Sequence, residues 1–144
     1  MNDMPETGVI ADHAVRLRGL AATGLTAALA AAAVTTLAAA LARAAGVDFE
    51  IPDGGEAIPL GGFAVVTGFF SAVGVALAAA LLRRSARPAE RFLWITVSLT
   101  AISLLPPLLS GANTGTTTAL LGLHLLPAAV MIPTLTRGLR ARSA

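Results

Sequence analysis

The sequence predicts an all-α membrane protein, a four-transmembrane-helix bundle with a short extracellular β-hairpin between the first and second helices. Three observations support this fold class. Hydrophobic residues make up 56% of the chain and charged residues only 12%, well below the usual quarter for soluble domains. The apolar residues form long uncharged segments, which is the signature of membrane spans. All the basic side chains other than histidine are arginines, and they flank these segments.

The uncharged segments predict four spans, at about residues 19–45, 61–82, 92–109 and 116–136. Each span reaches the roughly 20 residues that a bilayer needs, the third only just. The transmembrane domain therefore covers residues 16–138. We expect an N-terminal tail at 1–15, loose or a short helix in water, and a C-terminal tail at 139–144.

The arginines predict how the spans are oriented. All of them except Arg43 fall on one side of this threading: Arg16, Arg18, Arg83, Arg84, Arg87, Arg91, Arg137, Arg140 and Arg142. Because cytoplasmic segments next to spans are enriched in basic residues, both termini and the 83–91 connection are expected in the cytoplasm. Phe92 and Trp94 then lie at the inner headgroup level, where aromatic side chains are favoured. We expect a multi-pass protein of the plasma membrane.

The first span has an alternative interpretation as a secretory signal, since arginines, an apolar stretch and Ala-Leu-Ala at 40–42 follow one another. However, the apolar stretch is longer than the apolar region of a signal. The tail before it, with Asp3, Glu6 and Asp12, is also more acidic than the start of a signal. We therefore interpret this segment as an uncleaved span.

The segment VDFEIPDGGEAIPLGG joins the first two spans. Val47, Phe49 and Ile51 alternate with acidic residues, a period of two that is typical of a strand. The PDGG sequence that follows has turn chemistry, and residues 56–60 again favour an extended chain. This pattern predicts the short β-hairpin, which would cap the outer end of the bundle.

The same segment contains a cluster of carboxylates: Asp48, Glu50, Asp53 and Glu56. Oxygen ligands of this kind suit calcium, but the spacing matches no calcium-binding loop. We interpret the cluster as a solvated acidic loop in which one carboxylate pairs with Arg43, and we expect neither a metal site nor a cofactor.

Two shorter patterns predict where helices begin and end. Asn113 and Thr114, in the uncharged SGANTGTTT loop, are suitable N-cap residues for the fourth span. Pro106 and Pro107 cannot continue a regular hydrogen-bond ladder, so the third span should kink or end there.

Small side chains on the second span predict close helix packing, because helices in lipid associate where their backbones can approach. Gly68, Ala72, Ala76 and Ala80 follow one another at four-residue spacing. We expect this row to help form a compact bundle. The same row could instead mediate a homo-oligomer.

His124 is the deepest ionisable residue in the predicted spans, close to the bilayer midplane at 1.5 Å per residue. Thr100 and Ser103 lie at a similar depth on the third span. Pro127 lacks an N–H and frees the carbonyl of Leu123 beside the histidine. The candidate intramembrane polar site is therefore His124, Ser103, Thr100 and Pro127, with Ser71 and Thr35 or Thr36 as further polar residues at this level.

Two interpretations of this site are open. In one, His124 lines a polar pocket or proton path, since ionisable groups inside membranes are costly and often functional. In the other, a neutral imidazole hydrogen-bonds to Ser103, Thr100 or a freed carbonyl and holds two helices together.

The chain lacks several residue types and motifs that enzymes commonly use. It contains no cysteine and no tyrosine, which excludes thiolate and tyrosyl chemistry. It also has no HExxH motif, no Ser-His-Asp arrangement and no carboxylate inside a span. We therefore expect no catalytic, cofactor-binding or metal-binding residues, and no enzymatic activity.

By elimination, the sequence favours a non-catalytic bundle with a structural, accessory or regulatory role in the cell membrane. Its expected partners are the lipid bilayer, anionic headgroups at the arginine-rich cytoplasmic face, and a second copy or another membrane protein. Nucleic acid is not expected, because the arginines flank spans. The alternative is a small solute or proton-linked carrier with a mid-membrane pocket around His124.

The overall plan also resembles a known family. The resemblance is carried by the alanine-rich first span, EIPDGGEAIPLGGF, RPAERF and GANTGTTTALLGLHLLPAAVMIP. These segments are similar to an uncharacterised family, a domain of unknown function, of small four-span actinobacterial integral membrane proteins. The resemblance covers about residues 15–138. It implies a membrane location and a topology, but no activity.

Overall fold

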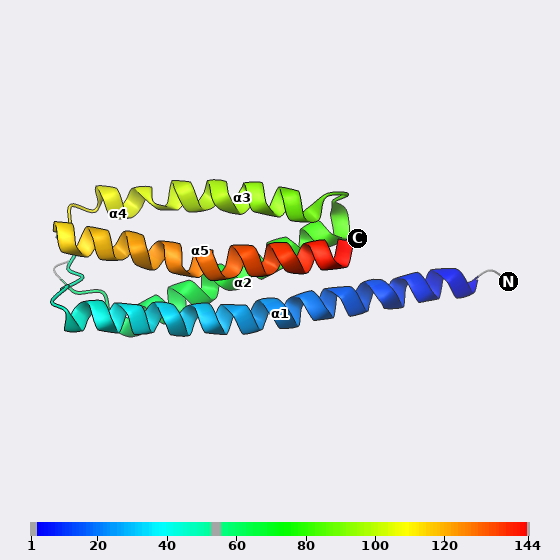
Figure 1. Ribbon diagram of the computed structural model, residues 1–144, viewed down its shortest axis with the longest axis horizontal. Coiled ribbons are helices and arrows are strands. Elements are labelled where there is room, and N and C mark those ends of the chain that lie inside the picture. Colours follow the sequence, from blue (N-terminus) through cyan, green and yellow to red (C-terminus); the bar gives the residue numbers. More distant parts are fainter. Residues whose placement is uncertain (1–2, 53–55, 144) are drawn as a thin grey trace.

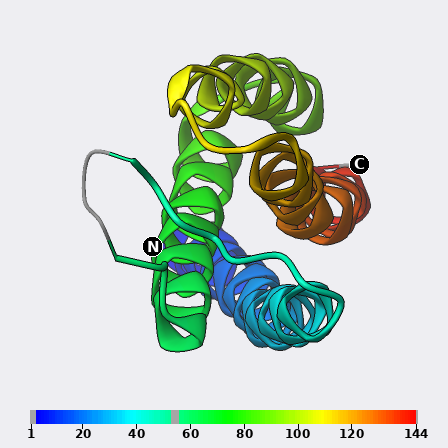
Figure 2. The same ribbon diagram turned by 90° about the vertical axis from the view of Figure 1, so that its left-hand side faces the viewer.

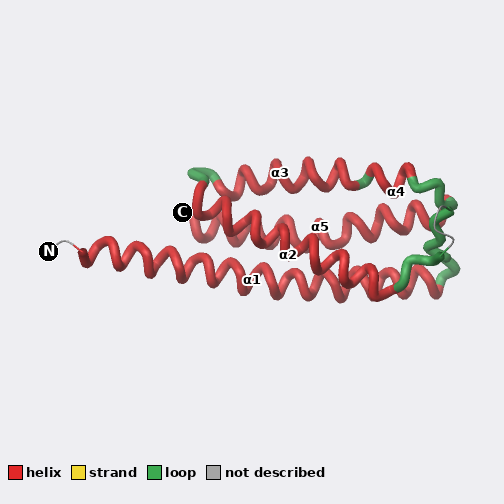
Figure 3. The backbone as a smooth tube through the Cα atoms, turned by 180° about the vertical axis from the view of Figure 1, so that it is seen from behind, coloured by secondary structure: helices red, strands yellow, loops and turns green. Residues whose placement is uncertain are grey.

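The computed structural model describes residues 3–52 and 56–143, with side chains from Thr7 onward. This part of the chain forms α-helices joined by short connections, and it contains no strand (Figure 3). The all-α prediction is therefore confirmed. The helices are α1 (Asp3–Ala44), α2 (Leu60–Arg84), α3 (Pro88–Ser103), α4 (Leu105–Leu109) and α5 (Thr114–Ser143).

Four segments of the described chain are long and apolar enough to cross a membrane: Thr7–Ala44, Leu60–Arg84, Pro88–Leu109 and Thr114–Ser143. They correspond to the four predicted spans, and the third contains both α3 and α4. The helices extend further at their polar ends than the spans do. In particular, α1 begins at Asp3, so the N-terminal tail continues the first helix.

The helices run lengthwise beside one another (Figure 1). The C-terminus and the α2–α3 connection lie at one end of the bundle, here called the terminal end. The α1–α2 and α4–α5 connections lie at the opposite end, the loop end. Seen along its length, the bundle has α2 and α5 between α1 and α3 (Figure 2). Accordingly, α1 and α3 each pack against α2 and α5. Among the described residues, none of α1 contacts α3.

Small side chains of α1 allow close packing against its neighbours. At Gly24, an added Cβ would lie 2.6 Å from Val75 Cγ2 on α2 and 3.2 Å from Leu135 Cδ2 on α5. Only glycine permits this approach without displacement of a neighbour. Gly24 thus places the α1 backbone directly against both partner helices, in the manner of small residues at membrane helix interfaces.

The predicted packing role of the small-residue row on α2 is wrong for this bundle. Ala72, Ala76 and Ala80 are exposed, and a Cβ added at Gly68 would meet nothing within 4 Å. The buried face of α2 instead carries Thr67, Ser71, Val75 and Ala78. The two rows have nearly the same spacing and lie side by side on the helix. The spacing alone therefore could not decide which row packs inward.

The predicted β-hairpin is also wrong. The described part of the α1–α2 connection contains one isolated antiparallel bridge, between Glu50 and Ala57, and no strand. The reason lies at Phe49, which has φ 55° and a side chain with 0% exposure. The left-handed backbone turns this ring into the bundle and breaks the two-residue alternation. Residues 53–55, which include most of the predicted turn, lie outside the described residues.

The proline pair interrupts the third span, as predicted. α3 ends at Ser103, and α4 begins at Leu105 with Pro106 and Pro107 in its first turn. Proline is accepted in a first turn because the N–H groups there need no helical partner. The break therefore comes just before the prolines.

Candidate functional site

His124 and Ser103 are in contact, as one of the two interpretations of the polar site expects. His124, in the first half of α5, places its Nε2 2.8 Å from the Oγ of Ser103, the last residue of α3. Both side chains are half-buried. The hydrogen bond therefore links two helices that are close in space but separated in the chain by α4 and a loop.

The hydrogen bonds of Ser103 indicate which group donates to which. The Ser103 hydroxyl donates to the Thr100 carbonyl at 2.7 Å. A hydroxyl has one hydrogen to donate, so Ser103 Oγ must accept from His124 Nε2. This arrangement corresponds to a neutral imidazole that carries its hydrogen on Nε2, or to the protonated ring.

The other predicted members of the site do not contact the imidazole through hydrogen bonds. The Thr100 hydroxyl donates to the Thr96 carbonyl at 2.7 Å, on its own helix. Pro127 lies inside α5, so the carbonyl of Leu123 has no helical N–H partner. The structure therefore reduces the hydrogen-bonded part of the site to His124 and Ser103.

The polar residues expected on α1 and α2 differ in their environments. Thr36 donates to the Ala32 carbonyl at 2.8 Å. Thr35 is 2% exposed, and its Oγ1 has no hydrogen-bond partner. Ser71 lies on the buried face of α2. No described hydrogen bond joins these residues to His124.

A second polar cluster, which the sequence did not predict, lies at the loop end around Asp48. Its carboxylate accepts the Thr116 hydroxyl at 2.7 Å, the Asn113 side-chain amide at 3.1 Å and the Glu50 N–H at 3.1 Å. These bonds, first that from the Glu50 N–H and then that from Thr116, lower the pKa of Asp48 below its ordinary 3.8. The cluster therefore fastens the α1–α2 connection to the start of α5.

Asn113 takes part in this cluster and also caps α5. Its Oδ1 accepts the N–H of Thr116 at 2.8 Å, the bond expected from an N-cap residue to the third residue of the helix. The predicted N-cap at Asn113 is confirmed. Because one amide serves both contacts, the helix start and the acidic loop are held together.

Phe49 and Arg43 make further contacts at the loop end. The Phe49 ring packs edge-on against Phe63, with centroids 5.1 Å apart, and the Arg43 guanidinium lies 5.9 Å from the Phe49 centroid. Arg43 also donates to the Ile58 carbonyl. None of the described carboxylates pairs with Arg43. Asp53, one of the predicted candidates, lies outside the described residues.

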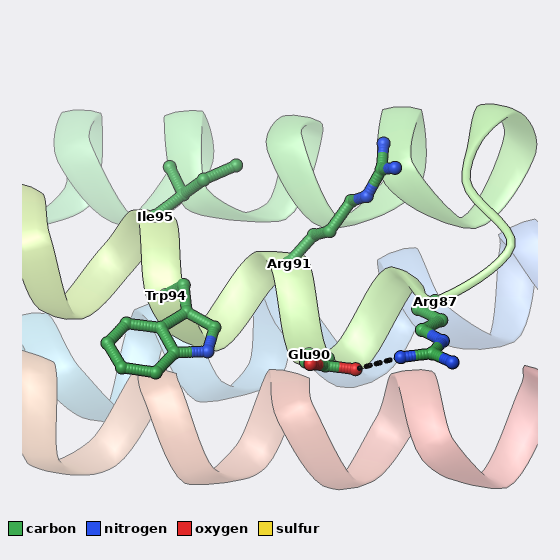
Figure 4. A pocket seen from close by; sticks show the side chains of 5 residues that line it. All are labelled: Arg87, Glu90, Arg91, Trp94 and Ile95. Atoms are coloured by element: carbon green, nitrogen blue, oxygen red, sulfur yellow. Dashed lines mark hydrogen bonds and ion pairs between the residues drawn. The ribbon is translucent and has the colours of Figure 1, made fainter.

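The terminal end carries a shallow groove on α3, lined by Arg87, Glu90, Arg91, Trp94 and Ile95 (Figure 4). Arg87 and Glu90 form an exposed ion pair with Nη1 and Oε2 3.5 Å apart. Among the described residues, no group of three or more histidine or acidic side chains is arranged to hold a metal ion.

Comparison with known proteins leaves the function open. No curated protein matches the chain, and no solved structure does. One family model matches residues 15–141, which agrees with the extent of the resemblance noted in the sequence. The chain therefore belongs to this family, which is described as a family of unknown function (DUF6069).

Proposed function

We propose that this chain is a small, non-catalytic, multi-pass protein of an actinobacterial cell membrane, with a structural, accessory or regulatory role. Its outer surface supports a bilayer setting. Phe69, Phe70, Leu29, Leu41 and Trp94 are each more than 60% exposed. A surface so rich in large apolar side chains is disfavoured in water, whereas lipid chains solvate it.

The arginines support an orientation with both termini in the cytoplasm. Arg83 and Arg84 end α2, and Arg140 and Arg142 end α5. These helix ends meet at the terminal end of the bundle (Figure 1). Arg43 lies near the loop end. Basic residues beside spans favour the cytoplasmic side.

The observation that carries the non-catalytic role is the His124–Ser103 hydrogen bond. α3 contributes few buried side chains, namely Pro88, Ala89 and Phe92 in its first turns. No side chain of α3 beyond Phe92 is buried, and the His124–Ser103 hydrogen bond links the far end of α3 to α5. In this setting His124 acts as a tie between helices, which is a structural use of an intramembrane polar group.

The membrane placement is tested with reporter fusions, one at residue 144 and one inserted within residues 52–56. We expect the first to report the cytoplasm and the second the opposite side. If both report the same side, the four-span topology is refuted.

A proton-linked carrier is the second candidate, and the depth of His124 in its span favours it. Its test is the decay of an imposed pH gradient in proteoliposomes that contain wild type or His124→Ala. The structural role predicts equal decay for the two proteins. Faster decay with wild type, lost in His124→Ala, would favour the carrier.

A further inference from the structure

The groove on α3 combines positive charge with an apolar surface. Its lining residues recur at three- and four-residue spacing, so they share one side of the helix. On this shared face, Arg91 and Ile95 extend toward one edge, whereas Trp94, Glu90 and Arg87 extend toward the opposite edge (Figure 4). The groove between them is cationic toward the start of α3 and apolar one turn further on.

The charge of this groove is not neutralised within the described residues. Glu90 is the only acidic residue that lines it, and its carboxylate pairs with Arg87. Arg91 is exposed and makes no ion pair or hydrogen bond with any described side chain. Arg83 and Arg84, just across the α2–α3 connection, add further positive charge. The groove therefore attracts an anion.

The apolar part of the groove is suited to the boundary between headgroups and acyl chains. Trp94 is 70% exposed, and tryptophan in membrane proteins favours this level because its ring is apolar and its N–H is polar. Arg91 and Ile95 are one helical turn apart, about 6 Å along the axis. A ligand that bridges them has an anionic group next to a hydrocarbon chain.

We propose that this groove binds one anionic phospholipid. The phosphodiester lies against Arg91 and Arg87, and an acyl chain lies along Trp94 and Ile95. Guanidinium groups suit this headgroup because they present several N–H donors to phosphate oxygens. The inference rests on the proposed membrane placement, with the α2–α3 connection at the cytoplasmic headgroups.

The site can be followed directly, because Trp94 is the only tryptophan in the chain. The protein is reconstituted in phosphatidylcholine vesicles that contain equal mole fractions of brominated phosphatidylglycerol or brominated phosphatidylcholine. Bromine in the acyl chain quenches tryptophan at short range. We expect stronger quenching of Trp94 by the anionic lipid.

Arg91→Gln tests the contact with the headgroup. A basic residue near an anionic membrane surface contributes enough that its loss should lower the preference for phosphatidylglycerol about fivefold. Arg140→Gln is the matched control, because Arg140 is exposed at the end of α5 and lies outside the groove. This control should keep the wild-type preference. Circular dichroism checks that each variant keeps its helices.

Three results would overturn the site. Equal quenching of wild type by both lipids would show no anion selectivity at Trp94 and would leave the membrane placement intact. An equal loss of preference in Arg91→Gln and Arg140→Gln would indicate a diffuse charge effect. Loss of the preference on adding inorganic phosphate, but not chloride of the same ionic strength, would identify free phosphate as the ligand. Absence of quenching by either lipid would instead refute the membrane placement.

Discussion

At the scale of single residues, His124 shows how an apolar helix accommodates a polar side chain. Its Nε2 is satisfied by Ser103, which in turn donates to the Thr100 carbonyl. A polar group that lacks a hydrogen-bond partner in lipid costs roughly several kcal/mol of free energy. The pair therefore stabilises the α3–α5 contact by avoiding that cost.

The coupling between His124 and Ser103 can be measured by a double-mutant cycle. We expect His124→Leu and Ser103→Ala each to lower the thermal stability in detergent, and the double variant to lose less than the sum. The interaction energy should be about 0.6 kcal/mol, the average for hydrogen bonds between membrane helices, and should not exceed about 1.7 kcal/mol. Strict additivity would show that the two residues do not interact. His124→Asn, which keeps a donor, should be less destabilising than His124→Leu.

The lowered pKa of Asp48 predicts that the stability of the fold decreases at low pH. Its pKa is lower in the folded chain than its ordinary 3.8, because the Glu50 N–H and the Thr116 and Asn113 side chains donate to the carboxylate. A carboxyl of this kind stabilises the fold above its unfolded pKa, and the contribution disappears as the pH falls through the folded pKa. The affected window lies below about pH 4.

We therefore expect the thermal stability of wild type in detergent to fall as the pH is lowered through this window. Asp48→Asn should start less stable at neutral pH and should change less over the same range. Glu50→Gln is the control, because the Glu50 carboxylate makes no hydrogen bond or ion pair with any described residue. If Asp48→Asn follows the wild-type profile, the Asp48 bonds contribute nothing to folding.

At the scale of the helices, close approach at Gly24 decides how α1 packs. We expect Gly24→Ala to lower the stability by about 1–3 kcal/mol, the usual cost of overpacking, because the new Cβ would lie 2.6 Å from Val75 Cγ2. Adding Val75→Ala should relieve part of this loss. Thermal unfolding in detergent measures both effects.

Gly68→Ala is the matched control for this prediction. Gly68 belongs to the small-residue row that the sequence predicted to pack, but a Cβ there meets nothing within 4 Å. Its substitution should leave the stability of the bundle unchanged. A Gly68→Ala variant as unstable as Gly24→Ala would place the α2 row at a helix interface after all.

At the scale of the whole molecule, the bundle begins well after the start of α1. The first turns of α1 extend beyond the other helices (Figure 1). From Thr7 to Gly19 no described side chain is buried, and Leu20, with 0% exposure, is the first that is. The family match likewise begins at residue 15.

Deletion of residues 2–14 should therefore change the melting temperature by no more than about 2 °C. It removes the exposed Asp12–Arg16 ion pair, and exposed pairs contribute little. It keeps the hydrogen bond from Arg16 to the Arg142 carbonyl. A deletion that also removes Leu20 should be clearly destabilising. If the shorter deletion is equally damaging, the N-terminal turns belong to the folded bundle.

The sequence by itself determined the features that depend on neighbouring residues along the chain. Segment length and apolar content predicted the four candidate spans, because solvation of a helix by lipid is decided within that helix. The break before Pro106 and the cap at Asn113 were also predicted, since both follow from local backbone hydrogen bonding.

Only the tertiary structure decided which residues meet across the bundle. It turned Phe49 inward in place of the predicted hairpin, joined Asp48 to Thr116, and buried the row of α2 that contains Val75 instead of the row that contains Ala76. From the partners that the sequence offered to His124, it selected Ser103. These outcomes depend on how helices far apart in the chain are placed side by side, and a periodic pattern along one helix does not contain that information.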